Sequence, residues 1–188
     1  MITLLHVYPP TRSRSKNRAH LLRLQTVREI QASMLVVGLH DCSFLYKLHS
    51  AGHLLDICLP RIGLSHLEAG KAYHFPDGPW VEYKGTIPQN EVQNKQKDLE
   101  QEANGLISVG GKVYVAILPY DEAAVLCGGC LPDYVPKGST PRTVRIGDAP
   151  GCPCGGTHVS NISDIGCIKV SQIRSKKGST KVYYNVES

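Results

Sequence analysis

Two short stretches, about a hundred residues apart, carry side chains that can bind a transition metal. His49 and His53 stand four residues apart in an apolar run, and Cys154 and His158 stand four apart in the segment CPCGGTH. On a helix, residues four apart project from the same face, so the two imidazoles can meet at one point. Imidazoles and a thiolate together form a ligand set that Zn²⁺ accepts and that oxygen-preferring cations do not. Either pair alone is a weak signal, but together they predict a zinc site if the fold brings them side by side.

The other cysteines allow rival interpretations. The chain has seven cysteines, and because we expect no secretory leader, thiols or metal ligands are favoured over disulfides. The CGGC segment, Cys127 to Cys130, could join Cys152 and Cys154 in a four-cysteine zinc site, although CPC does not have the spacing of a second CxxC pair. A thioredoxin-like role for CGGC is weaker, because the segment follows a predicted helix and precedes a proline. Cys152 could also replace Cys154 as the ligand.

The surrounding pattern predicts the elements that position these side chains. Residues 46–63 form a predicted helix that carries the two histidines and ends at Pro60 and Gly63. The further predicted elements are a strand in 78–85, a long helix in 88–111 with one apolar stripe, a strand in 112–119, a short helix in 120–127, a strand in 141–148 and a hairpin in 167–186. Helices and strands mix without βαβ spacing, so we expect an α+β fold, a mostly antiparallel sheet with packed helices.

Basic residues are concentrated near the N-terminus. The formal net charge is +5, but six basic residues precede the first acidic residue, Glu29, and the other 15 basic and 16 acidic residues nearly cancel. We interpret residues 1–45 as a basic N-terminal segment, either an arm or an organellar transit peptide, and residues 46–188 as the domain. No stretch approaches the roughly 20 apolar residues of a membrane span. These features favour a cytoplasmic protein without membrane contact, with organellar import as the alternative.

The two histidine-containing stretches also resemble those of a known family. HSAGHLL followed by CGGTHV is similar to the editing domain of alanyl-tRNA synthetase, which threonyl-tRNA synthetase shares, and to its free-standing relatives, the AlaX proteins. RIGDAPGCPCGGTHVSNISDIGCIKV resembles the usual close of that domain, and GKAYHFPDGPWVEYKG looks closest to the eukaryotic, plant-like branch. The resemblance covers Leu48 to Val186; residues 1–47 show neither the small β-barrel nor the charged helix that precede the histidines in longer members, and residues 1–25 resemble nothing in the family.

The resemblance implies an activity and a set of site residues. The family hydrolyses the ester of mischarged alanine tRNA, usually seryl-tRNA and sometimes glycyl-tRNA, so we expect an ATP-independent deacylase that proofreads in trans at the acceptor end. Proofreading is needed because an apolar pocket rejects one added hydroxyl group poorly. The implied zinc ligands, catalytic through the metal, are His49, His53, Cys154 and His158.

Three alternatives stay open. Four protein ligands are typical of structural zinc, whereas catalytic zinc keeps one position for water, so the sequence does not choose between four ligands and three plus a water. The second alternative is a non-catalytic tRNA-binding module with a structural zinc, and the third is a zinc protein unrelated to tRNA. The oligomeric state is open between a monomer and a weak dimer.

Basic residues in two places are predicted to contact the tRNA. Arg142 and Arg145 are candidates for the 3′-terminal nucleotide, and the basic hairpin is a candidate for the acceptor-stem phosphates, through Arg174, Lys176, Lys177 and Lys181. A solvated charged face is the alternative for both groups.

Overall fold

The computed structural model describes the backbone of residues 27–187 and the side chains of residues 42–187. The predictions for the extreme N-terminal residues fall on residues 1–26, outside this described part. The chain divides into two units, Met1–Leu39 and His40–Ser188, and every contact discussed below lies within the second. The predicted domain boundary near residue 45 stays a prediction.

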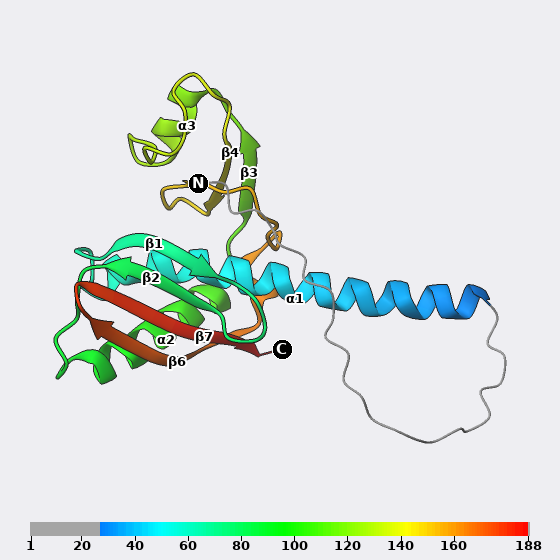
Figure 1. The fold of residues 1–188 in the computed structure, drawn as a ribbon, viewed down its shortest axis with the longest axis horizontal. Helices are drawn as coiled ribbons and strands as arrows, with labels where there is room; N and C mark the ends of the chain where they lie inside the picture. The colour runs from blue at the N-terminus through cyan, green and yellow to red at the C-terminus, as the bar shows by residue number, and fades with distance from the viewer. Residues whose placement is uncertain (1–26, 188) are drawn as a thin grey trace. The chain divides into compact units, whose positions relative to one another are not determined.

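Within the described residues the chain forms an α+β fold, as predicted (Figure 1). The helices are α1 (Val27–Arg61), α2 (Val92–Val109), α3 (Tyr120–Leu126) and a 3-10 turn, η1 (Ile162–Ile165). The strands are β1 (Glu68–Tyr73), β2 (Trp80–Lys84), β3 (Val113–Ile117), β4 (Arg142–Ile146), β5 (Cys152–Pro153), β6 (Cys167–Lys176) and β7 (Ser179–Glu187). One sheet has the strand order β1-β2-β7-β6 and a second the order β3-β4-β5, and all neighbouring strands are antiparallel.

Most predicted elements match the observed ones, but the short elements β5 and η1 were not predicted, and two longer elements also differ. The helix predicted in residues 46–63 is the end of α1, which begins at Val27, and it ends at Arg61 one residue after Pro60. Strand β1 was not predicted, because its six residues, EAGKAY, contain neither an apolar run nor alternation. The C-terminal hairpin is confirmed, and its turn residues Lys177 and Gly178 have φ values of 53° and 80°. No helix in the described part of the chain is long and apolar enough to cross a membrane.

The core lies between the four-stranded sheet and helices α1 and α2, which lie behind the sheet in Figure 1. Strands β2 and β7 bury every second residue, so one face of the sheet packs against the helices and the other stays outside. Helix α1 contributes Leu48, Leu54, Leu55 and Leu59, all at most 2% exposed. Burial of this apolar stripe sets the rotation of α1 about its own axis and therefore the direction in which its histidines point.

Candidate metal centre

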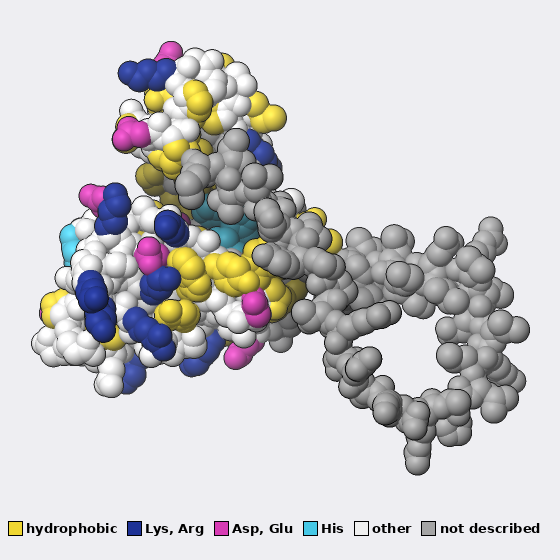
Figure 2. All heavy atoms as spheres, in the orientation of Figure 1, with side chains coloured by type: hydrophobic (Ala, Val, Ile, Leu, Met, Phe, Trp, Pro, Cys, Tyr) yellow, Lys and Arg dark blue, Asp and Glu magenta, His cyan; other side chains and the backbone are white. Residues whose placement is uncertain are grey.

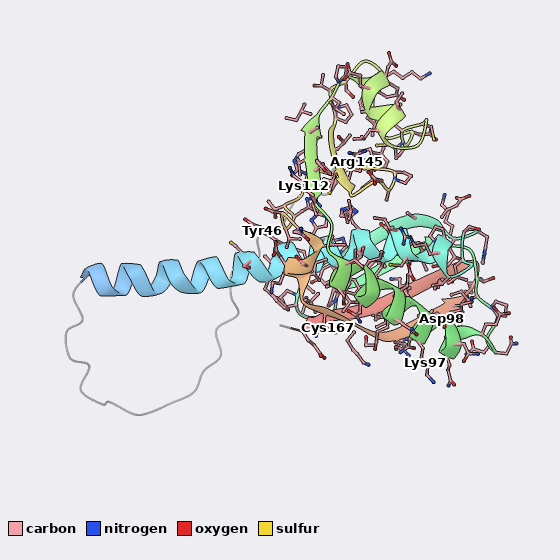
Figure 3. All side chains as sticks on the ribbon, turned by 180° about the vertical axis from the view of Figure 1, so that it is seen from behind. Tyr46, Lys97, Asp98, Lys112, Arg145 and Cys167 are labelled. Atoms are coloured by element: carbon pink, nitrogen blue, oxygen red, sulfur yellow. The ribbon has the colours of Figure 1, made fainter. Side chains whose placement is uncertain are left out.

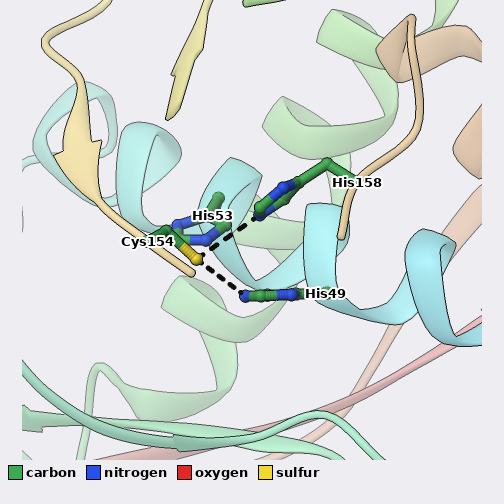
Figure 4. Close-up of side chains that lie close together, drawn as sticks. All are labelled: His49, His53, Cys154 and His158. Carbon is green, nitrogen blue, oxygen red and sulfur yellow. Dashed lines mark hydrogen bonds between the residues drawn. The ribbon is translucent and has the colours of Figure 1, made fainter. Parts of the chain in front are cut away.

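The two histidine-containing stretches meet in space. One ligand atom from each of His49, His53, Cys154 and His158 lies within 4.8 Å of the other three, and this is the group of potential metal ligands found among the described residues. Cys154 Sγ is 3.3 Å from His49 Nε2 and 3.6 Å from His158 Nε2 (Figure 4). The first pair comes from α1 and the second from the loop after β5. The tertiary structure thus assembles the donor set that the sequence suggested.

A hydrogen bond fixes the loop against the helix. The hydroxyl of Ser50, fully buried between the two histidines of α1, accepts a hydrogen bond of 3.0 Å from the backbone N–H of Val159. On the other side of the loop, Arg142 Nη1 donates to the carbonyl oxygen of Cys154 at 2.6 Å. The loop that carries Cys154 and His158 is therefore held at both ends.

The loop also approaches one histidine so closely that only glycine fits. A Cβ atom on Gly156 would lie 2.1 Å from Cε1 and 2.4 Å from Nδ1 of His49, well inside van der Waals contact. A Cβ on the neighbouring Gly155 would meet nothing within 4 Å. Of these two glycines, Gly156 is the one whose missing side chain leaves room for the His49 ring.

The site favours neutral imidazoles. Burial, with a smaller contribution from the nearby His49, lowers the pKa of His53 to about 3. Burial likewise lowers the pKa of His158 to about 3 and lowers that of His49. Burial raises the pKa of the Cys154 thiol, against a backbone hydrogen bond from Gly156 and the charge of Arg142. Without a metal, the centre at pH 7 therefore holds uncharged imidazoles and a protonated thiol.

The donor set fits zinc. Three imidazoles and one thiolate match the nitrogen and sulfur ligands that zinc takes in proteins. Within the described residues, the buried Nε2 of His53 has no hydrogen-bond partner. A buried polar atom without a partner is costly, and a bound cation would give this nitrogen one.

Two further side chains surround His53. Cys152 Sγ lies 3.4 Å from His53 Nδ1, and the Asp56 carboxylate lies 3.9 Å from the same nitrogen. Asp56 accepts a hydrogen bond of 2.7 Å from the Tyr83 hydroxyl. Desolvation raises the pKa of Asp56 to about 6, and the Tyr83 hydrogen bond acts in the opposite direction. Cys152 therefore lies behind the ring of His53, whereas Cys154 shares the centre.

A cavity of about 530 Å³ opens beside this group. His53, Asp56 and Cys152 form part of its wall, and most of the remaining lining is apolar, including Ile57 and Val144. This volume lies within the range of small-molecule sites.

A fourth imidazole, His74, was missed by the sequence analysis. Its ring centroid lies 4.7 Å from that of His49, and its Nδ1 lies 2.6 Å from the Tyr184 hydroxyl oxygen. Tyr184 donates its one hydrogen to the carbonyl of Leu48 at 2.9 Å, so the Nδ1–H of His74 is the donor in the shorter contact. Burial lowers the pKa of His74 to about 3, and a neutral imidazole protonated on Nδ1 leaves Nε2 as an acceptor. His74 has no ligand-like spacing to another histidine or cysteine, so only its place in the tract GKAYHFPDGPW hinted at it.

The predicted tRNA contacts lie in different settings. Arg142 points toward the centre, where it holds the Cys154 carbonyl. Arg145 on β4 and Lys112, the residue before β3, both lie over the ring of Tyr114, about 5 Å from its centroid. Figure 3 labels these two basic residues. The four hairpin residues lie on β6, on β7 and in the turn between them, namely Arg174, Lys176, Lys177 and Lys181. None of these positions tests the predicted role.

The rival cysteine site does not form in the described residues. Cys127 and Cys130 follow α3, and neither belongs to a group of three or more potential ligands there. Both are free thiols in the structure.

Comparison with known proteins places the chain near one family. Residues 142–183 match the family described as "Threonyl and Alanyl tRNA synthetase second additional domain". An alanine–tRNA ligase from Acidithiobacillus ferridurans is 32% identical over 154 residues, which is 80% of this chain and 17% of that protein. The alanine–tRNA ligase of Methanococcus vannielii is 28% identical over 150 residues, which is 75% of this chain and 16% of that protein. The chain spans less than a fifth of the length of these relatives, and the matches support a relationship to the editing-domain family of alanyl- and threonyl-tRNA synthetases.

Proposed function

We propose that this protein is a free-standing, zinc-dependent deacylase of the AlaX type and of the eukaryotic, plant-like branch. It would hydrolyse, in trans, the ester bond of mischarged alanine tRNA carrying serine or glycine. The observation that carries the proposal is the convergence of the four donor side chains, one pair from α1 and one from the loop after β5, within 4.8 Å. The family matches add the substrate class, since both the matched domain and the matched relatives bear the names of tRNA synthetases.

In this proposal the metal is held by His49, His53, Cys154 and His158, and the rest of the site shapes the reaction. Bound zinc supplies a Lewis acid that can polarise an ester carbonyl or lower the pKa of a water. The neutral imidazoles are ready to bind it without first losing a proton.

His74 has a different role in this proposal, as a positioning residue. Its Nδ1–H is engaged by Tyr184, so its Nε2 accepts a hydrogen bond from a water or from the substrate amino group. A pKa of about 3 makes His74 a weak base, so it suits orientation of a group better than removal of its proton. The apolar cavity beside His53 would take the esterified end and exclude bulk water from it.

The deciding experiment measures ester loss from two charged forms of the same tRNA. Purified protein is incubated with serine-charged and with alanine-charged alanine tRNA, and with glycine-charged tRNA for comparison. Selective loss of the serine ester supports the proposal. The His49→Ala, His53→Ala double variant is expected to lose both zinc and activity. The matched control is His66→Ala, because His66 is an exposed histidine whose side chain hydrogen-bonds the Thr86 carbonyl, and it should not affect zinc or activity.

A second candidate is a tRNA-binding module with a structural zinc. It is favoured by one observation, that four protein side chains lie close enough together to bind one metal, and four is the number of protein ligands that structural zinc takes. Binding of charged tRNA without ester loss, with zinc at full stoichiometry, would support the module over the enzyme. Zinc retained in the double histidine variant would instead place the metal on Cys127 and Cys130 and contradict both candidates.

A further inference from the structure

The outer face of the four-stranded sheet carries a row of aromatic side chains. Tyr73 on β1 lies opposite Trp80 on β2, and Trp80 lies opposite Tyr183 on β7. Residues directly opposite each other in antiparallel strands share a face. Their neighbours Val81, Val182 and Tyr184 are buried against the helices, so the three rings lie on the solvent side.

Cationic side chains form the next row of the same face. Glu82 lies opposite Lys181, and Lys181 lies opposite Arg174. Lys181 Nζ is 3.6 Å from the centroid of the Trp80 ring, and Arg174 Cζ is 5.3 Å from that of Tyr183. Figure 2 shows this face, with hydrophobic side chains beside lysines and arginines over the strands.

The charges of the face are only partly compensated. Lys181 pairs with Glu82 at 3.4 Å, and Lys84 lies 3.9 Å from Glu68 in an exposed pair that contributes little. Arg174 and Lys176 form no ion pair with any residue of the described chain, and Lys177 follows them in the turn. The face therefore has an excess of positive charge interleaved with aromatic rings.

This combination selects the chemistry of the partner. A protein partner that covered the rings with apolar groups would take the cations out of water without supplying opposite charges. A single strand of nucleic acid supplies both needs, because its bases stack on aromatic rings and its phosphates pair with Lys and Arg. A duplex offers phosphates but keeps its bases stacked on each other.

We propose that the outer face of the β1-β2-β7-β6 sheet binds single-stranded RNA. The bases stack on Tyr73, Trp80 and Tyr183, and the phosphates contact Arg174 and Lys181. The aromatic row begins one residue before His74, whose ring lies against His49, so the face ends beside the candidate metal centre. That the strand is the unpaired 3′ end of a tRNA rests on the proposed function, whereas the binding of a single strand does not.

The experiment uses tryptophan fluorescence. Trp80 is the one tryptophan of the chain, so its quenching reports binding at this face even if the basic N-terminal residues also attract RNA. The full-length, metal-free protein is titrated with an uncharged single-stranded RNA of about eight nucleotides and with an abasic strand of the same length. We expect saturable quenching by the RNA and at least about fivefold weaker binding of the abasic strand.

Three variants test the face, and one serves as a control. Tyr183→Ala should weaken RNA binding at least about fivefold, while Tyr183→Phe, which keeps the ring, should bind as the wild type does. Lys181→Gln should lower the slope of log affinity against log salt by about one. Tyr134→Ala removes an aromatic ring that is 62% exposed in the α3–β4 connection, and it should change nothing.

Three results would overturn the proposal. They are equal affinity for the abasic strand, full affinity in Tyr183→Ala, and quenching by a polyglutamate peptide as strong as that by RNA. Because the protein is metal-free and the RNA uncharged, the outcome is independent of deacylation. Ester hydrolysis without tryptophan quenching would contradict only the RNA-binding face. Quenching without ester hydrolysis would contradict only the proposed deacylase activity.

Discussion

Gly156→Ala is the sharpest test of how the loop positions the metal ligands. The new Cβ would lie 2.1 Å from Cε1 of His49, whereas ordinary contact begins at 3.4 Å, so the atoms must separate by about 1.3 Å. The loop cannot easily retreat, because Ser50 and Arg142 hold it at both ends. The His49 ring must therefore move, and by far more than the roughly 0.2 Å that metal–ligand distances tolerate.

We expect Gly156→Ala to bind zinc at least about 100-fold more weakly than the wild type, which corresponds to about 2.7 kcal/mol. This is the upper end of the loss seen when groups that only support a ligand are removed, and here a ligand itself is displaced. Gly155→Ala is the matched control. It makes the same substitution one residue earlier, where a Cβ meets nothing within 4 Å, so the entropy change of the unfolded chain is nearly the same.

The assay is competition for zinc with a chromophoric chelator, and circular dichroism of the metal-free proteins verifies that both variants fold. The reasoning is refuted if the two alanine variants bind zinc with dissociation constants within about threefold of each other. In that case the loop does not determine the position of His49, and the donor atoms are held by something other than this close packing.

Three further predictions concern the same region. By helix propensity alone, Gly52→Ala would stabilise α1 by up to about 1 kcal/mol. Its Cβ, however, would lie 2.3 Å from Cε1 of His74, so we expect the variant to unfold at a lower urea concentration. A higher urea midpoint would contradict the close packing of His74 on Gly52. Zinc binding at pH 7 should release about one proton, from Cys154, because the imidazoles are already neutral. Calorimetry in buffers of different ionisation enthalpy measures the number of protons released. Release of two protons would indicate a second thiol ligand. With His53 at a pKa of about 3 when folded and 6.5 when unfolded, its contribution to stability is present above pH 6.5 and lost as the pH falls toward 3. By pH 5 about 2 kcal/mol of the stability of the metal-free protein has been lost through His53, and the His53→Gln variant should lack this part of the pH dependence in urea denaturation.

Local patterns in the sequence were sufficient to predict most of the helices and strands and the two pairs of candidate metal ligands. The apolar stripe of α2 predicted its buried side, and the observed buried residues include Leu99 and Ala103. The four-residue spacing of His49 and His53 was enough to put both imidazoles on one side of a helix, because that geometry depends only on the helix itself. Strand β1 lacked such a pattern and was found only as the partner of β2.

Which distant residues meet was decided by the tertiary structure. The spacing of Cys152 and Cys154 does not say which thiol joins the histidines, and the observed loop puts Cys154 at the centre and Cys152 behind His53. His74 reaches the site because Gly52 on α1 has no side chain and so leaves room for the His74 ring. Tyr184 on the last strand holds that ring through a hydrogen bond with Nδ1.

The sequence by itself therefore determined the helix that presents two imidazoles and the hairpin, and it supplied the candidate donor residues with the choice between Cys152 and Cys154 still open. The tertiary structure alone decided their convergence, the fourth imidazole and the aromatic row across three strands. The physical reason is that spacing within one element sets the direction of a side chain, whereas contacts between elements depend on how the buried faces pack and on the strand register.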